Sequence, residues 1–174
     1  MTDTLLLGAH MSIAGGVDKA VGRGVGVGCT ALQIFTKNAS QWRAKPLADE
    51  DIARFKAALS ASPIAPEAVV AHDSYLINLG SPDDARWEQS IAAFTEELRR
   101  CDQLGVPFLV TRPGAHMGSG EEAGLARVAA GMVRALAASE RATVLLETTA
   151  GQGTYLGHRF SHLARLLELT PPEY

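Results

Sequence analysis

Side chains that could bind a metal ion or transfer a proton follow short apolar runs along this chain. In chain order they are His10, Thr36–Lys37, His72–Asp73, Arg112 and Glu147. A histidine at the end of a buried strand can hold a metal ion through a neutral ring nitrogen, although a lone histidine is more often structural. A carboxylate at a strand edge is costly unless it is paired or bound to a cation. The pattern indicates a metal or acid–base site at Glu147, with an ion pair to Arg112 as the alternative.

Two loop segments carry side chains suited to nucleic acid. Residues Lys37–Lys45 combine three cations, the indole of Trp42 and small polar groups. Cations can contact phosphates and an indole can pack on a base or sugar, whereas a solvated loop anchored by one tryptophan would look similar. After His72, the pair Tyr75–Leu76 would present apolar side chains at the same end of the predicted sheet.

The elements that must position these residues alternate regularly. Apolar runs too short for helices predict buried strands, and they lie at Leu5–Gly8, Ala31–Phe35, Ala68–Ala71, Pro107–Val110 and Thr143–Leu146. Between them, apolar residues recur at three- or four-residue steps and predict helices, notably at Trp87, Ile91, Phe94, Leu98 and Cys101, at Ile52, Phe55 and Leu59, and at Phe160, Leu163 and Leu167. We expect helix starts at Ser81–Pro82 and at a capping box of Ser119 with Glu122.

Strands that alternate with helices predict an α/β protein with a parallel sheet. A doubly wound sheet concentrates its site at one crevice, whereas a β/α barrel assembles its site from many strand ends. Five polar strand ends favour an incomplete TIM (β/α)8 barrel with about five βα units, because a closed barrel needs about 250 residues. Glycines 22, 24, 26 and 28 precede a strand, so they soften the end of the first helix and imply no nucleotide cofactor.

Composition limits the class of protein. The 174 residues, 47% hydrophobic and 20% charged, suit one domain spanning 1–174. The net charge of −3 argues against a generally basic nucleic-acid coat. Residues Met1–Thr4 begin no signal peptide and no apolar run is long enough to cross a bilayer, so we expect a cytoplasmic protein without a membrane partner. Cys29 and Cys101 have no metal-binding spacing and are expected to be buried, reduced thiols.

The chain resembles the N-terminal part of the endonuclease IV family of apurinic/apyrimidinic endonucleases. The motifs that carry the resemblance are Gly8–Gly16, Phe35–Asn38 with Gln41–Arg43, His72–Gly80, Arg100–Gly105 and Glu147–Gly153. The resemblance covers essentially all 174 residues. It implies a xylose-isomerase-like TIM barrel holding three Zn²⁺ ions, which cleaves double-stranded DNA on the 5′ side of abasic sites. Zinc supplies hydroxide near neutral pH and stabilises charge on the attacked phosphate.

By motif match, the resemblance also assigns roles to individual residues. His72 would be a zinc ligand, and Glu147 would bridge two zinc ions as a ligand and catalytic group. The DNA contacts would be made by Asn38, Gln41, Trp42, Tyr75 and Leu76. Wedging an apolar side chain into DNA is cheapest where a base is already missing.

The chain departs from the family pattern in two places. Arg112 stands where the family has a zinc-binding histidine, and a guanidinium cannot coordinate a metal. His116 is a weak substitute, and an Arg112–Glu147 pair could replace the ion. Ser40 stands where some members have an arginine that enters the DNA. In addition, three further strand–helix units of the family are not in this sequence, so we expect no full zinc cluster and expect self-association through open barrel edges.

The leading hypothesis is therefore a zinc-dependent endonuclease of base excision repair, whose activity in this chain alone is doubtful. The alternative is a non-catalytic fragment that binds DNA lesions or a partner and keeps the Asn38 and Tyr75 loops. A sugar-phosphate isomerase on a related metal barrel would use similar His and Glu residues but leaves those two loops unexplained.

Overall fold

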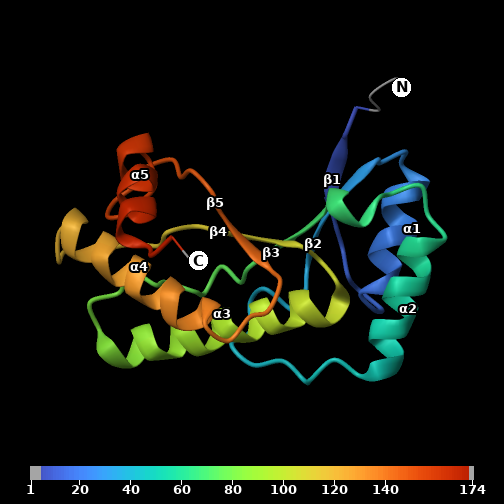
Figure 1. Cartoon of the computed structure of the whole chain (residues 1–174), viewed down its shortest axis with the longest axis horizontal. Helices are drawn as coiled ribbons and strands as arrows, with labels where there is room; N and C mark the ends of the chain where they lie inside the picture. The colour runs from blue at the N-terminus through green and yellow to red at the C-terminus, as the bar shows by residue number, and fades with distance from the viewer. Residues whose placement is uncertain (1–4, 173–174) are drawn as a thin grey trace.

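The computed structural model describes residues 5–172, in which strands and helices alternate along the chain (Figure 1). The strands are β1 (Gly8–Met11), β2 (Ala31–Phe35), β3 (Val69–His72), β4 (Phe108–Thr111) and β5 (Thr143–Leu146). The helices are α1 (Asp18–Gly26), α2 (Asp49–Ser60), α3 (Asp84–Leu104), α4 (Glu121–Leu136) and α5 (Phe160–Leu169), with a 3-10 turn at Pro66–Ala68.

The strands form one parallel sheet in the order β1-β2-β3-β4-β5 within the described residues. A doubly wound sheet reverses its strand order at a switch point, whereas a barrel adds each new strand beside the previous one. The unbroken order therefore confirms the predicted partial TIM barrel.

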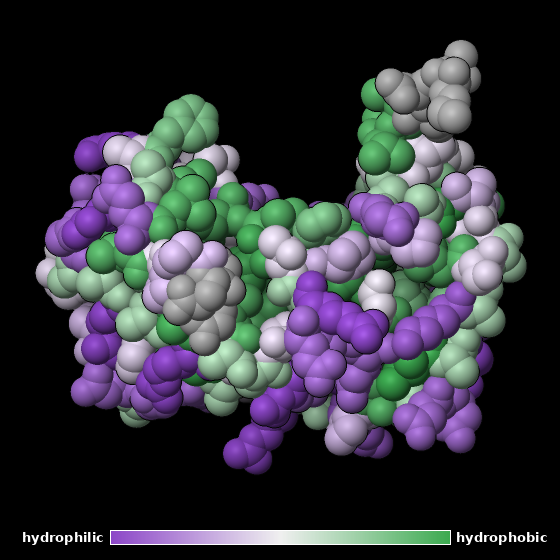
Figure 2. Space-filling view, viewed as in Figure 1, coloured by the Kyte–Doolittle hydropathy of each residue, from purple (hydrophilic) through white to green (hydrophobic). Residues whose placement is uncertain are grey.

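The core lies between the sheet and the helices that follow one side of it (Figure 1). In β2, Leu32 and Ile34 are buried, while the residues alternating with them are partly exposed on the other face. The predicted apolar stripe of α3 is confirmed, because Ile91, Phe94 and Leu98 are all buried. Helices cover one face of the sheet (Figure 1). The surface is hollowed between the end with α5 and the end with β1 (Figure 2).

Two predicted strands have the expected bounds and two are displaced by one residue, but the first prediction was wrong. We expected a strand at Leu5–Gly8, whereas β1 begins at Gly8, and Leu5, Leu6 and Leu7 are exposed. The reason is the register, because pairing with β2 begins at Gly8 opposite Ala31. Consequently His10 lies within β1 and does not follow it.

Both predicted helix caps were also wrong. The N-cap of α3 is Asp83, whose carboxylate accepts a hydrogen bond from the backbone N–H of Arg86, whereas Ser81 accepts from the N–H of Asp83. The N-cap of α4 is a glycine without a side-chain cap. Ser119 instead donates to the backbone oxygen of His116. In both cases a nearby turn uses the hydroxyl group that the sequence pattern assigned to the helix.

The last helix buries a different face from the one expected. Phe160 and Leu167 are 82% and 69% exposed, while His162 and Leu166 are buried against the rest of the molecule. The apolar period was read correctly as a helix, but it does not say which side packs on α4.

Two further expectations concern thiols and membranes. Cys29 and Cys101 are free and buried, as predicted, and burial raises the pKa of the Cys101 thiol. Among residues 5–172, no helix is both long enough and apolar enough to cross a bilayer. The prediction about Met1–Thr4 lies outside the described residues.

Candidate functional site

The carboxyl ends of β3, β4 and β5 bring three predicted site residues together. Arg112 Nε donates a hydrogen bond to Glu147 Oε2 over 2.9 Å, and His72 Nε2 lies 3.2 Å from the same oxygen. These ends are neighbours because β4 pairs with both β3 and β5. The ion pair that the sequence left as an alternative to a metal ligand is thus present.

The ring of His72 is oriented by the backbone. Its Nδ1 lies 2.8 Å from the carbonyl oxygen of Asp73, and because a carbonyl only accepts, Nδ1 carries a proton. The side chain is 5% exposed, so the ring has little freedom to turn. Nε2 is therefore the atom directed at Glu147, where it can donate when protonated or offer its lone pair to a metal ion.

Glu147 is held as a carboxylate. Burial raises the pKa of Glu147, but hydrogen bonds from Arg112 and His72 outweigh this effect and keep that pKa below its usual range. The carboxylate therefore remains negatively charged at neutral pH and is paired with a guanidinium.

Asp73, next to His72, behaves differently. Thr111 Oγ1 donates a hydrogen bond to Asp73 Oδ2 over 2.6 Å, and burial raises the pKa of Asp73 to about 8. The sequence marked Asp73 only as part of a polar strand end and gave it no role. Its position directly after a buried strand was the available signal that its carboxyl would be removed from water.

These residues do not complete a metal site. Within residues 5–172, no set of three His, Cys, Asp or Glu side chains with ligand atoms inside 4.8 Å of one another includes His72 or Glu147. Arg112 cannot ligate a metal. His116 Nδ1 accepts from the backbone N–H groups of Gly118 and Gly120 and so belongs to its own turn. The described chain therefore offers two ligands at this place, not a zinc centre.

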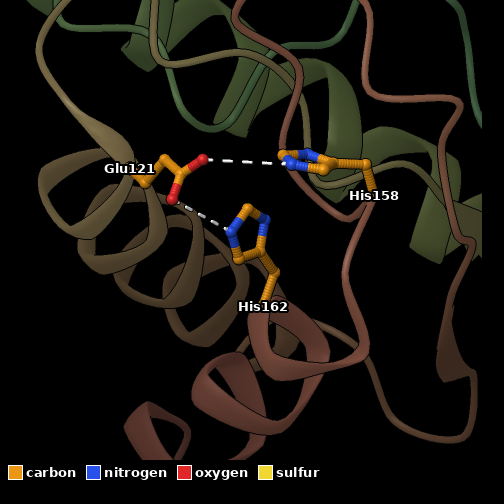
Figure 3. Close-up of side chains that lie close together, drawn as sticks. All are labelled: Glu121, His158 and His162. Carbon is orange, nitrogen blue, oxygen red and sulfur yellow. Dashed lines mark ion pairs between the residues drawn. The ribbon is translucent and has the colours of Figure 1, made fainter.

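A second cluster lies away from these strand ends, where Glu121 at the start of α4 meets two histidines (Figure 3). His162 Nε2 lies 3.3 Å from Glu121 Oε2, and His158 Nε2 lies 3.9 Å from Glu121 Oε1. The sequence analysis missed this group, because Glu121 lies far along the chain from the two histidines and was interpreted only as part of a helix start, while the histidines were given no role.

The hydrogen bonds of this cluster are those of a structural contact. His162 Nδ1 accepts from the backbone N–H of Gly157, so in a neutral ring Nε2 carries the proton and donates to Glu121. Ligation through Nε2 would break one of these bonds. Arg159 lies 3.5 Å from Glu121, and the positive end of the α4 dipole also disfavours a cation there. The three side chains therefore join the start of α4 to α5 and the segment before it through direct side-chain contacts.

The other predicted strand ends are used elsewhere. His10 packs its ring 4.3 Å from that of Phe35, and burial lowers the pKa of His10. Thr36 and Lys37 turn away from the strand ends and are buried against Glu97 of α3. Lys37 is thus not an exposed cation of the 37–45 loop, contrary to the sequence interpretation.

The predicted DNA-contact loops lie next to each other. Ser74 Oγ donates to the backbone oxygen of Ala39 over 2.6 Å and so ties the loop after β3 to the loop after β2. Asn38 and Gln41 are exposed, and Trp42 is partly buried. Trp42 and Leu76 line one open groove of about 560 Å³.

Tyr75 precedes Leu76 in the loop after β3 and contacts residues at the strand ends. The residue is 60% exposed, and its ring contacts that of Phe35 edge-on with centroids 5.4 Å apart. The guanidinium carbon of Arg112 lies 5.2 Å from the centre of the Tyr75 ring. An exposed aromatic side chain therefore sits directly beside the His72–Glu147 pair.

Comparisons with known proteins give this arrangement a family. A family model described as "Xylose isomerase-like TIM barrel" matches residues 24–173. A probable endonuclease 4 of Chloroflexus aggregans is 58% identical over 166 residues, which cover 94% of this chain and 57% of that protein. The probable endonuclease 4 of Geobacter sulfurreducens is 47% identical over 92% of this chain and 54% of its own length. The chain thus spans little more than half of these relatives.

Solved structures agree. Endonuclease IV from Thermus thermophilus superposes with a TM-score of 0.80 at 38% identity, covering 93% of this chain and 58% of that one. A 3-keto-D-glucoside 4-epimerase from E. coli superposes with a TM-score of 0.70 at 13% identity, over 95% of this chain and 65% of that one, which shows the shared fold alone. The chain belongs to the xylose isomerase-like TIM barrel family and, within it, to the endonuclease IV group.

Proposed function

We propose that this chain is part of a zinc-dependent endonuclease of base excision repair that hydrolyses the phosphodiester 5′ to abasic sites in double-stranded DNA. The observation that carries the proposal is the meeting of the Trp42 and Leu76 loops at one groove, with Tyr75 exposed beside His72 and Glu147. The names of the relatives, endonuclease 4 and endonuclease IV, support an endonuclease. The role of this chain itself would be to bind the damaged duplex.

The two loops would make different contacts with DNA. Tyr75 and Leu76 would enter the helix where a base is missing, because no stacking has to be broken there. Asn38, Gln41 and Trp42 would contact the duplex beside it. The exposed Arg43 and Lys45 would contact phosphates.

The expectation that zinc is bound rests on the resemblance to the endonuclease IV family. His72 and Glu147 would supply two ligands, and Glu147 would also be the catalytic group. Arg112 occupies the position of a third ligand and pairs with Glu147 instead. We therefore expect no incision by this chain alone.

The Arg112–Glu147 pair also favours a second candidate function, a lesion-binding fragment without catalysis. In that case the pair neutralises the carboxylate in place of a metal ion, and the two loops still recognise the lesion. Both candidates require preferential binding to abasic DNA, and incision after the ligand position is restored would be expected of the first candidate alone.

The test uses the purified chain with a fluorescent duplex that contains a stable abasic analogue, and with the matched intact duplex. We expect tighter binding to the abasic duplex, and a loss of about 5- to 150-fold in affinity for Tyr75→Ala, because stacking contributes about 1–3 kcal/mol per base. Phe160→Ala is the matched control, since Phe160 is an exposed aromatic residue on α5.

Equal affinity of the wild-type chain for both duplexes would contradict both candidate functions. Incision of the abasic duplex by the Arg112→His variant with added zinc would favour the enzyme, and binding without incision by either protein would favour the lesion-binding fragment.

A further inference from the structure

The first cation of the 37–45 loop does not face solvent. The Lys37 side chain is 1% exposed, and its Nζ lies 3.2 Å from Glu97 Oε1 on α3. The same ammonium donates a hydrogen bond to the backbone oxygen of Gln41 over 2.8 Å. Its charge is thus neutralised inside the protein, while one of its N–H groups fixes the middle of the loop from the protein interior.

Helix α3 holds the ends of the same loop. The second Glu97 oxygen accepts from the hydroxyl of Thr36, and Glu97 is 1% exposed. One turn later, Arg100 donates from Nε and Nη2 to the backbone oxygen of Thr36, over 3.1 and 2.6 Å. Its Nη1 donates to the backbone oxygen of Lys45 over 3.1 Å. Two α3 side chains therefore fix the loop where it leaves β2 and where it returns towards α2.

A buried ion pair is costly to assemble from water, so its presence under a surface loop needs a reason. Four hydrogen bonds from Lys37 and Arg100 end on three backbone oxygens, those of Thr36, Gln41 and Lys45, and so fix the conformation of the loop whatever its exposed side chains are. A loop that is already ordered loses less conformational entropy when a ligand binds. This arrangement favours binding through Trp42 and its neighbours.

We propose that Lys37, Glu97 and Arg100 are positioning residues for DNA binding, and that Lys37 makes no phosphate contact although it lies in a cationic loop. This proposal rests on the proposed function. The phosphate contacts of the loop would then come from Arg43 and Lys45, which are both exposed.

The dependence of DNA affinity on salt separates a positioning residue from a phosphate contact. Each phosphate contact that is lost reduces the slope of log K against log salt by about 0.9. We expect Arg43→Gln and Lys45→Gln to reduce the slope by about this amount. Lys37→Met should lower affinity for abasic DNA by about 10-fold with an unchanged slope. A slope reduced by about 0.9 in Lys37→Met would overturn the proposal.

A second measurement needs no DNA. In a Trp87→Phe background Trp42 is the only tryptophan, so its quenching by acrylamide reports on the loop. We expect stronger quenching of Trp42 when Lys37→Met or Glu97→Gln is added, and little change for Lys45→Gln. Unchanged quenching of Trp42 in both Lys37→Met and Glu97→Gln would overturn the proposal. Because this measurement uses no DNA, its result does not depend on whether the proposed function is correct.

A variant that loses one buried partner could unfold. The double variant Lys37→Met with Glu97→Gln leaves no unpaired charge, and circular dichroism would establish that it folds. If this folded variant bound abasic DNA as tightly as the wild-type chain and its Trp42 were quenched by acrylamide to the same extent, the positioning role would be wrong. Weaker binding with the wild-type salt slope and stronger Trp42 quenching would support it.

Discussion

Replacing Arg112 with histidine should create a tighter zinc site at the carboxyl ends of β3, β4 and β5. In the wild-type chain the atom that a metal ion would take, Glu147 Oε2, already accepts a hydrogen bond from Arg112 Nε over 2.9 Å. His72 Nε2 lies 3.2 Å from the same oxygen. A zinc ion held between Glu147 Oε2 and His72 Nε2 would therefore have to displace the guanidinium.

The penalty from Arg112 has two parts. Because the side chains of Arg112 and Glu147 are 47% and 38% exposed, breaking their ion pair costs only about 0.2–1 kcal/mol. A displaced guanidinium about 5 Å from a doubly charged ion is repelled by about 1.7 kcal/mol even at the dielectric constant of water. Together these effects weaken zinc binding by about 25- to 95-fold.

The experiment compares three proteins by competition with a chromophoric zinc chelator at pH 7.5. Arg112→Gln removes the positive charge without adding a ligand, so we expect a gain of about 25- to 95-fold in affinity. Arg112→His should bind more tightly still, because it also offers an imidazole. Wild-type affinity in Arg112→Gln would refute the electrostatic reasoning. If Arg112→His bound no more tightly than Arg112→Gln, the position would not be a ligand position.

Three further predictions concern other parts of the molecule. In the Arg112→His protein, Glu121→Gln should leave zinc stoichiometry unchanged, and loss of zinc would contradict the hydrogen-bond assignment of the Glu121 cluster. Asp102 accepts hydrogen bonds from the Ser139 hydroxyl and three successive backbone N–H groups before β5, so Asp102→Ala should lower the free energy of unfolding by about 3 kcal/mol in urea titrations. A loss below about 1 kcal/mol would argue against this capping role. The chain should self-associate in sedimentation experiments, and Leu6→Glu should weaken this association if the exposed residues before β1 take part.

The sequence predicted the fold closely because four of the five strands and most helices carry their own local pattern. The run Ala31–Phe35 is alternately buried and partly exposed, and it became β2 without a change of bounds. The predictions of the N-caps of α3 and α4 were wrong because a serine hydroxyl has several backbone partners within reach. The prediction of the buried face of α5 was wrong because a helical period alone does not identify which neighbouring element covers the helix.

The site was predictable in part. The contact of Arg112 with Glu147 followed from two polar residues at the ends of strands that pair. The burial of Lys37 did not follow, because its partner Glu97 lies 60 residues away on α3. A charged residue after a strand can turn to either side of the sheet, and only the packed structure decides which.

Arg112 is expected to affect both zinc affinity and affinity for abasic DNA. Its guanidinium contacts Glu147 on one side and lies 5.2 Å from the centre of the Tyr75 ring on the other. A cation over an aromatic ring contributes about 0.5–1 kcal/mol at an exposed site, so Arg112 helps to hold Tyr75 beside the strand ends. A histidine at this position would gain a metal ligand and lose that contact. Zinc affinity and abasic-site affinity should therefore change in opposite directions in Arg112→His, while Arg112→Lys, which keeps a cation, should alter both less.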